Sequence, residues 1–407
     1  MNIASKYPRA ASLLGAASLL SLCIGAARAD VVTDWNITAL GITVSSPPPV
    51  EMRAMAITHA AIFDAVNAIT RTYQPYLVQP APPAGSSQDA AAASAAHGVL
   101  SWLYPGSKPV LDAALAASLA KLPDGAGKDG GLAVGREAAQ KYIAARSGDG
   151  SERKPDYTPG SGPGKWQPTA PGNLPFASVI WADVKPFALT SATEVSAPGP
   201  LALDSAEYAR DLDEVRRVGG KNSKERSADQ TAAAIFSAAT SSQVFGPAAR
   251  AAVMARGSSV IDNARTFALM QVAAADGWIA GWAIKKQHSL WRPITAIRKA
   301  AADADPNWTP LLITPNHPDY VSGHCITSGA ITQTLRLVLG NDGVPFSATL
   351  AGNLSRSYEN LTQAEKEIGD ARVWAGIHTR TADDHGAIVG HKIAELVVQR
   401  VAKPQAQ

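Results

Sequence analysis

The sequence predicts an all-α protein, and two observations lead to that fold class. Between residues 50 and 70, apolar positions recur at alternating intervals of three and four residues, which is the spacing of one helix face. These positions are Met52, Met55, His59, Ile62, Val66 and Ile69. Similar patterns cover 89–103, 109–121, 131–146, 205–218, 228–240, 258–285, 322–339, 362–375 and 384–402. Between them we find no convincing run with the alternation of a strand, so we expect helices packed as bundles.

The first 29 residues have the pattern of a secretory signal peptide. Lys6 and Arg9 precede an apolar run over 10–27, and an Ala-Arg-Ala sequence places a cleavage site before Asp30. A membrane anchor is the alternative, but the run is short for a bilayer span and rich in Ala, Gly and Ser. We therefore expect a secreted or periplasmic protein with no membrane attachment after cleavage.

Removal of this segment would leave a formally neutral chain. Three of the 37 basic residues lie in it and none of the 34 acidic ones, so 34 of each remain. The pI of 8.7 for the whole chain therefore does not favour nucleic-acid binding, and the sequence has no basic stripe. Cys23 would leave with the segment, so Cys325 has no partner for an internal disulfide. The fold must depend on its core, for which 46% hydrophobic residues are ample.

Two stretches rich in Pro and Gly, 75–87 and 158–175, interrupt the helical patterns. We expect residues 30–407 to form a single helical domain. The alternative is an N-terminal half, 30–157, joined by the second stretch to a catalytic half, 176–407. Six of the eight histidines follow Lys285, which places the expected chemistry in the last third of the chain.

The Ser322-Gly323-His324 turn is the first motif with chemical meaning. Ser322 stands at an expected N-cap, and the helix should run to a stop at Gly340. The free amides and partial positive charge of such a helix start suit an anion, and Gly323 permits close approach of the backbone. By itself the motif is equally typical of an ordinary capped helix.

A second motif joins Lys285 to Arg292 and Pro293. Trp278, Trp282 and Lys285 fall on one helix face, so the ammonium ends an apolar stripe and would either reach water or meet a buried anion. The guanidinium of Arg292 suits bidentate contact with an oxyanion. We expect Pro293 to end or bend the helix at that point.

The third motif, Arg372 and His378, follows a predicted capping box formed by Thr362 and Glu365. Six residues apart on a straight helix, the two side chains would point roughly 120° apart. They can face one site from two sides, or converge if the helix breaks near Gly376.

In this order, Lys-x6-Arg-Pro, Ser-Gly-His and Arg-x5-His, the chain resembles the vanadium-dependent haloperoxidase and type 2 phosphatidic acid phosphatase superfamily. The segments THAAIFDAVNAI, SAAHGVLSWLYPG, ERSADQTAAAIF and WRPITAIR resemble its secreted bacterial haloperoxidase-like branch, and the resemblance extends over nearly the whole chain after residue 29.

The resemblance implies an oxyanion site in the core of a helical bundle, occupied by vanadate or by phosphate. Lys285, Arg292 and Arg372 would hold the oxygens, together with Ser322 and the Gly323 amide. His378 would bind vanadium axially, or attack phosphorus in a phosphatase. His324 would be the acid–base. Vanadate mimics the geometry of phosphoryl transfer, so one cationic site serves both chemistries.

The sequence departs from the family pattern near this site. Val321 replaces the usual Pro before Ser-Gly-His, and Ala371 replaces a frequent Ser before Arg372. Ala382 stands where an acid usually orients the axial histidine. Asp383 and Asp384 are the candidates to replace that acid, and the sequence leaves open whether either reaches His378.

The first hypothesis is therefore a vanadate-dependent haloperoxidase that uses hydrogen peroxide to oxidise a halide, bromide first, in the presence of a small organic acceptor. The second is an exported acid phosphatase that hydrolyses a phosphate ester through a phosphohistidine at His378. The third is a non-catalytic oxyanion-binding protein, which Ala382 would favour. The sequence leaves the oligomeric state open.

Other residues near the motifs have structural interpretations. We expect His59 to be a core histidine, and Asp64 and Asn67 to fasten their helix. We expect His288, His317 and Trp291 to line the pocket or its entrance, and Cys325 to be structural.

Overall fold

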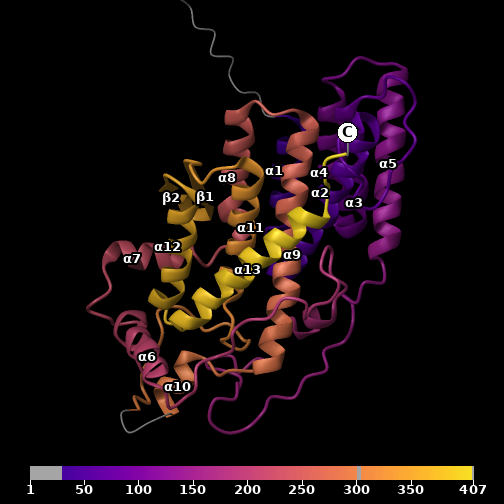
Figure 1. The fold of residues 1–407 in the computed structure, drawn as a ribbon. Coiled ribbons are helices and arrows are strands. Elements are labelled where there is room, and N and C mark those ends of the chain that lie inside the picture. Colours follow the sequence, from indigo (N-terminus) through magenta and orange to yellow (C-terminus); the bar gives the residue numbers. More distant parts are fainter. Residues whose placement is uncertain (1–29, 300–303, 406–407) are drawn as a thin grey trace, which may run out of the picture.

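The computed structural model describes residues 30–299 and 304–405, and the predicted signal peptide, 1–29, lies outside them. The all-α prediction is confirmed, because helices dominate the described chain (Figure 1). The first five helices are α1 (Val31–Thr43), α2 (Pro48–Thr70), α3 (Gln88–Leu103), α4 (Lys108–Leu119) and α5 (Ala126–Arg146). They are followed by α6 (Ala206–Gly219), α7 (Ala228–Phe236), α8 (Ser241–Arg256), α9 (Val260–His288) and α10 (Pro293–Lys299). The last three are α11 (Gly323–Leu339), α12 (Leu361–Trp374) and α13 (Arg380–Arg400).

Helix α9 runs through the middle of the fold (Figure 1). It packs against α2 from the first part of the chain and against α11 and α13 from the last part. It is the one helix among the described residues that is long and apolar enough to span a membrane, and its apolar window is wholly buried inside the protein. As the core helix, α9 carries Lys285 into the interior.

Buried carboxylates fasten the irregular segments to this helical core. Asp64 of α2 accepts hydrogen bonds from the backbone amides of residues 76–78 and from the Tyr142 hydroxyl. Asp276 of α9 accepts from the amides of residues 187–189 in the same manner. The predicted role of Asp64 is confirmed, because a buried amide needs an acceptor when it leaves regular structure.

His59 is a core residue, as expected. It is fully buried, its Nε2 lies 3.1 Å from the Asn36 amide nitrogen, and its ring stacks on Phe267 at 5.2 Å. Burial lowers the pKa of His59 to about 3, so the ring is neutral.

Three helices were missed by the sequence patterns. They are α1, α8 and α10. Helix α8 contains Pro247. Pro293, which was expected to end or bend a helix, is instead the first residue of α10. Proline tolerates the first helical position, since its missing N–H would have no partner in that turn. Helix α7 ends at Phe236 rather than at residue 240.

The expectation that no strand occurs was also wrong. Strands β1 (Phe346–Leu350) and β2 (Leu354–Tyr358) form an antiparallel hairpin, and the Phe346 and Tyr358 rings pack on each other with centroids 5.1 Å apart. Each strand has only five residues, too short for alternation to stand out from the surrounding loop.

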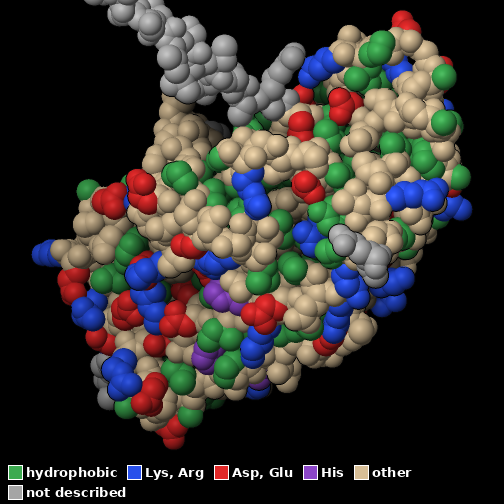
Figure 2. Space-filling model, turned by 45° about the horizontal axis from the view of Figure 1, so that its top comes forward, with side chains coloured by type: hydrophobic (Ala, Val, Ile, Leu, Met, Phe, Trp, Pro, Cys, Tyr) green, Lys and Arg blue, Asp and Glu red, His purple; other side chains and the backbone are tan. Residues whose placement is uncertain are grey.

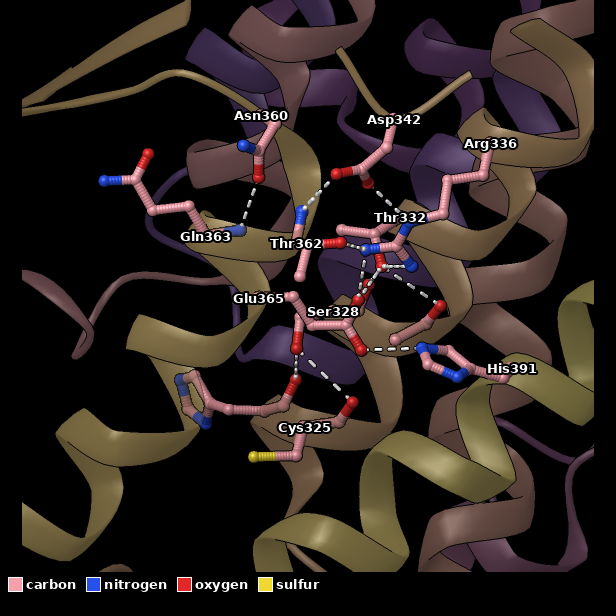
Figure 3. A network of polar contacts seen from close by, with 12 residues as sticks. Cys325, Ser328, Thr332, Arg336, Asp342, Asn360, Thr362, Gln363, Glu365 and His391 are labelled. Carbon is pink, nitrogen blue, oxygen red and sulfur yellow. Dashed lines mark hydrogen bonds and ion pairs between the residues drawn. The ribbon is translucent and has the colours of Figure 1, made fainter. Parts of the chain in front are cut away.

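The predicted capping box at the start of α12 was wrong as well. Asn360 is the N-cap and accepts from the Gln363 amide at 2.8 Å. Acidic and basic side chains are interspersed over much of the surface drawn in Figure 2, but Glu365 is turned inward. Figure 3 shows its carboxylate between Arg336 and His391, at 2.9 and 2.6 Å, so that it joins α11, α12 and α13.

Helices α11 and α13 approach each other closely through glycine. A Cβ atom at Gly390 would lie 2.3 Å from the Ile326 carbonyl oxygen and 2.7 Å from the Ala330 nitrogen. A Cβ at Gly329 would lie 2.8 Å from the Ala387 oxygen. These contacts hold the middle of α13 against the first turns of α11, the helix that begins beside Ser322 and His324.

We expect Gly390→Ala to lower the free energy of unfolding by about 1–3 kcal/mol, because the added methyl group forces the two backbones apart. Denaturant unfolding measures the change. Gly41→Ala in α1 is the matched control, since no atom lies within 4 Å of its Cβ position, and it should stabilise by roughly 0.5–1 kcal/mol. Equal effects of the two substitutions would contradict the close helix contact.

Candidate active site

The first turn of α11 forms one wall of the candidate site. Ser322 is the N-cap residue as predicted, but its hydroxyl makes no capping bond; it is buried and has no hydrogen-bond partner. The Ser322 amide donates to the Ala382 carbonyl at 2.8 Å, which ties the turn to the start of α13. A Cβ at Gly323 would lie 3.0 Å from the Trp282 ring, so glycine is needed for this close packing.

Lys285 enters the site from the last turns of α9. Its side chain is fully buried, and Nζ donates to the carbonyl oxygens of Pro318 and Asp319 at 2.7 and 3.0 Å. Burial, followed by the neighbouring Arg292, lowers the pKa of Lys285 well below its ordinary value, although Asp319 opposes that shift. The ammonium therefore lacks a close carboxylate partner and favours an incoming anion.

Arg292 lies just before α10 and is fully buried beside Lys285 and His378. Its Nε donates to the His317 carbonyl and one Nη to the Ile377 carbonyl, both at 2.6 Å. The same Nη lies 3.0 Å from Nε2 of His378. Because a guanidinium only donates, Nε2 must be the unprotonated nitrogen of that ring.

The acid that orients His378 is Asp319, which the sequence analysis did not identify. Its Oδ1 lies 2.6 Å from Nδ1 of His378, and its Oδ2 accepts from the Thr379 hydroxyl at 2.8 Å. Burial raises the pKa of Asp319 to about 6, so the group is largely ionised at neutral pH and accepts the Nδ1 proton. The pair keeps the lone pair of Nε2 facing Arg292, whose hydrogen bond a ligand at Nε2 would replace.

Neither Asp383 nor Asp384 replaces the missing acid, which answers the question that the sequence left open. Asp383 points toward α11, where its Oδ1 accepts from the Cys325 thiol at 3.2 Å and its Oδ2 has no partner. Asp384 is exposed. Asp319 comes from the loop before Ser322, 59 residues before His378, so a search near His378 could not find it.

Arg372 and His378 converge because the chain leaves the helix between them. Helix α12 ends at Trp374, and Gly376 has φ of 77°, a conformation that favours glycine. Arg372 is 2% exposed; one Nη donates to the Ser237 carbonyl at 2.8 Å, whereas its Nε has no partner. Of the two alternatives that the sequence left open, the structure shows the break near Gly376.

His324, like His317, is partly exposed, whereas the cationic side chains of the site are buried. Its Nε2 lies 3.2 Å from the Ala239 carbonyl oxygen. Since a carbonyl only accepts, Nε2 carries the proton of the neutral ring and Nδ1 is unprotonated. Burial, and after it Arg372, lowers the pKa of His324 well below its ordinary value. A bound anion would offset the repulsion from Arg372 and favour protonation of this ring.

These features fit a tetrahedral or trigonal oxyanion. Burial lowers the pKa of Lys285, Arg292 and Arg372, and the positive charges of Arg292 and Arg372 disfavour each other. Two buried polar atoms, Ser322 Oγ and Arg372 Nε, have no partner. An oxyanion would satisfy both atoms and the excess positive charge. No cluster of three or more His, Cys, Asp and Glu side chains in the described chain could hold a bare metal ion.

His317 is a second residue of the site that the sequence analysis placed only at its entrance. Its Nδ1 lies 3.0 Å from Arg292, and its ring centroid lies 4.9 Å from that of Trp282 and 6.4 Å from that of His378. The signal in the sequence was its position five residues before Ser322, in the loop that also supplies Asp319. His288 instead packs against Tyr320, and Trp291 donates to the Tyr208 hydroxyl at 2.5 Å.

Comparison with known proteins links this site to a family. Residues 265–406 match the family model of the VCPO second helical-bundle domain. The vanadium chloroperoxidase of Curvularia inaequalis is 27% identical over 393 residues, which cover 74% of this chain and 64% of that protein. The chain thus spans less than two thirds of the length of this relative.

Solved structures give the same result for the fold. The crystal structure of the first bacterial vanadium-dependent iodoperoxidase superposes with a TM-score of 0.78 at 25% identity, over 92% of this chain and 96% of that one. A holo-type bacterial vanadium-dependent chloroperoxidase superposes with a TM-score of 0.73 at 19% identity, over 87% and 93%. The family match over the last part of the chain and the shared fold support the vanadium-dependent haloperoxidase superfamily for this chain.

We expect Asp319→Asn to lower the affinity for vanadate by about 10–100-fold, because an outer partner of a metal-binding histidine sets the basicity of its ring. Phosphate affinity should not fall, since phosphate binding needs no bond to Nε2 and gains from the loss of a nearby negative charge. Calorimetric titration with each anion measures both effects, with the exposed Asp384→Asn as control. Parallel losses for the two anions would contradict this role.

The buried Asp383 should make stability depend on pH. Burial raises its pKa to about 8, so between about pH 4 and 8 the folded state keeps a proton that the unfolded chain releases. Its contribution is complete at low pH and is lost as pH rises toward 8. Asp383→Asn should therefore raise Tm relative to the wild type more at pH 8 than at pH 5.

Asp124→Asn is the control for this measurement. A hydrogen bond from Lys128 lowers the pKa of the exposed Asp124, so its replacement should give no gain at pH 8. A gain in Tm for Asp383→Asn that is the same at both pH values would show that Asp383 does not hold this proton.

Proposed function

We propose that this protein is a vanadate-dependent haloperoxidase that uses hydrogen peroxide to oxidise a halide, with bromide as its preferred halide. The observation that carries the proposal is the convergence of three buried cations on the Asp319-oriented Nε2 of His378, at the start of α11. The similar proteins, a chloroperoxidase and an iodoperoxidase, support the same class of reaction.

Vanadate, when bound, would supply a Lewis acid that activates peroxide without a redox-active side chain. The side chains of Lys285, Arg292 and Arg372 would hold its oxygens and offset their charge. The Ser322 hydroxyl, which lacks a partner, would donate to one of these oxygens. His324 would exchange protons at the solvent side of the site, because its side chain is partly exposed.

Asp319 would have a positioning role in this reaction. It holds the Nδ1 proton of His378 and so keeps Nε2 available as a ligand. Its carboxylate also lies 3.9 Å from an Nη of Arg292, which fixes the ring and the guanidinium relative to each other.

We also propose that the protein acts outside the cytoplasm, as a secreted or periplasmic enzyme. The support is the signal-peptide pattern of residues 1–29. In the proposed reaction, the oxidised halide then reacts with a small organic acceptor.

A paired assay tests the function. Orthovanadate, hydrogen peroxide and bromide are added to the purified protein, and bromination of a dye is followed; a second sample receives a phosphate monoester without vanadate. We expect vanadate-dependent bromination, and a loss of about 100-fold or more in Lys285→Ala and His378→Ala, because both remove contacts to the anion. Lys286→Ala is the matched control, since that neighbouring lysine is half-exposed and pairs with Asp183.

Either of two outcomes would overturn the proposal. Phosphate release that depends on His378, without bromination, would assign the site to the phosphatase branch. Vanadate binding without turnover in either sample would assign it to a non-catalytic oxyanion-binding protein.

A further inference from the structure

A cavity of about 820 Å³ lies between α6, the loop 161–167 and the segment 291–299 that contains α10. These elements lie at the lower end of the molecule in Figure 1. Of the described residues that line it, none belongs to the oxyanion site. Its volume is within the range of sites that take small organic molecules.

One wall of this cavity is apolar. It is lined by Tyr208 and Trp291, which are buried, by the partly buried Leu212 and by Leu203, which is 40% exposed. The Trp291 indole donates to the Tyr208 hydroxyl at 2.5 Å, which leaves the flat ring faces for apolar contact. Burial of a ligand ring against these side chains would be favourable, at about 25 cal/mol for each Å² of apolar surface removed from water.

The backbone on both sides of Trp291 holds this wall rigid. The Trp291 amide donates to the Gly164 carbonyl at 2.9 Å, and the Trp166 amide donates to the Ser289 carbonyl at 2.8 Å. Lys165 and Leu290 form a β-bridge between the two segments. The cavity is therefore formed before any ligand arrives, and a ligand would not have to order its wall.

Two exposed lysines, Lys165 and Lys299, lie at the rim of the cavity. Among the described residues that line it, the one acid is Asp213, and its carboxylate is already paired with Arg217 at 2.9 Å. An apolar chamber with a cationic rim complements a molecule that has an apolar body and one anionic group.

We propose that this cavity binds a small organic carboxylate with an aromatic ring system, the ring lying against Trp291 and Leu212 and the carboxylate facing Lys165 and Lys299. The inference does not depend on halide oxidation, because binding requires neither vanadate nor peroxide. Trp291, which lines the cavity, directly precedes Arg292 of the oxyanion site. The two sites are therefore adjacent along the backbone.

Calorimetric titration of the full protein, without vanadate, tests this site with naphthoate as the probe and naphthylmethanol as a neutral analogue of similar size. We expect saturable binding of one naphthoate per chain, with naphthylmethanol about five-fold weaker or more. The double variant Lys165→Glu, Lys299→Glu should weaken naphthoate by about ten-fold and reduce its advantage over the alcohol.

Two further variants make the result specific to the cavity. Leu203→Asp, at a side chain that is 40% exposed and so tolerant of change, should weaken both probes. Lys141→Glu on α5 is the control, because that exposed lysine does not line the cavity, and binding should be unchanged.

Three outcomes would overturn the proposal. The first is the absence of saturable naphthoate binding up to millimolar concentration. The second is equal binding of the two probes with no effect of the charge reversals. The third is loss of naphthoate binding in excess phosphate, which would place the carboxylate in the oxyanion site. Failure in any of these ways would leave the bromination assay unaffected.

Discussion

The structure depends on the burial of three cationic side chains at one point of a helical core. Lys285 and Arg292 are fully buried and Arg372 nearly so, and each would be costly to desolvate without partners. Backbone carbonyls of the loop before Ser322, of Ile377 and of Ser237 receive their N–H groups. These carbonyls belong to chain segments that have left regular helix, which explains why irregular backbone surrounds the site. The positive charge that these carbonyls do not offset would be neutralised by a bound anion.

The need to hold these buried cationic side chains at one point also explains how the surrounding helices are arranged. Helix α9 brings Lys285 to the site, and α11 presents its first turn there. The glycine contacts between α11 and α13 bring the start of α13 against Ser322. His378 follows directly after α12 and its break at Gly376. Small shifts of any of these helices would separate groups that act only together.

Asp319 illustrates how one function can be served from a different place in the chain. The usual acid four residues after the histidine is absent at Ala382, and Asp319 reaches the same ring nitrogen from the opposite side of the loop. The nearby Asp383 has become a buried carboxyl that faces Cys325. Its raised pKa means that it adds little negative charge to the anion site at neutral pH.

The sequence by itself determined the all-helical class and most of the long helices, because helical periodicity is a local property of the chain. The three spaced motifs named candidate site residues, but whether Arg372 and His378 converge was left open until the structure showed the chain leaving the helix at Gly376. The short hairpin, α8 with its internal Pro247, and the start of α10 at Pro293 depended on packing that local patterns do not contain. The partner of His378 was decided by tertiary structure alone, because a contact between residues 59 positions apart leaves no periodic signal. The inward turn of Glu365 was decided in the same way, by Arg336 and His391 on neighbouring helices.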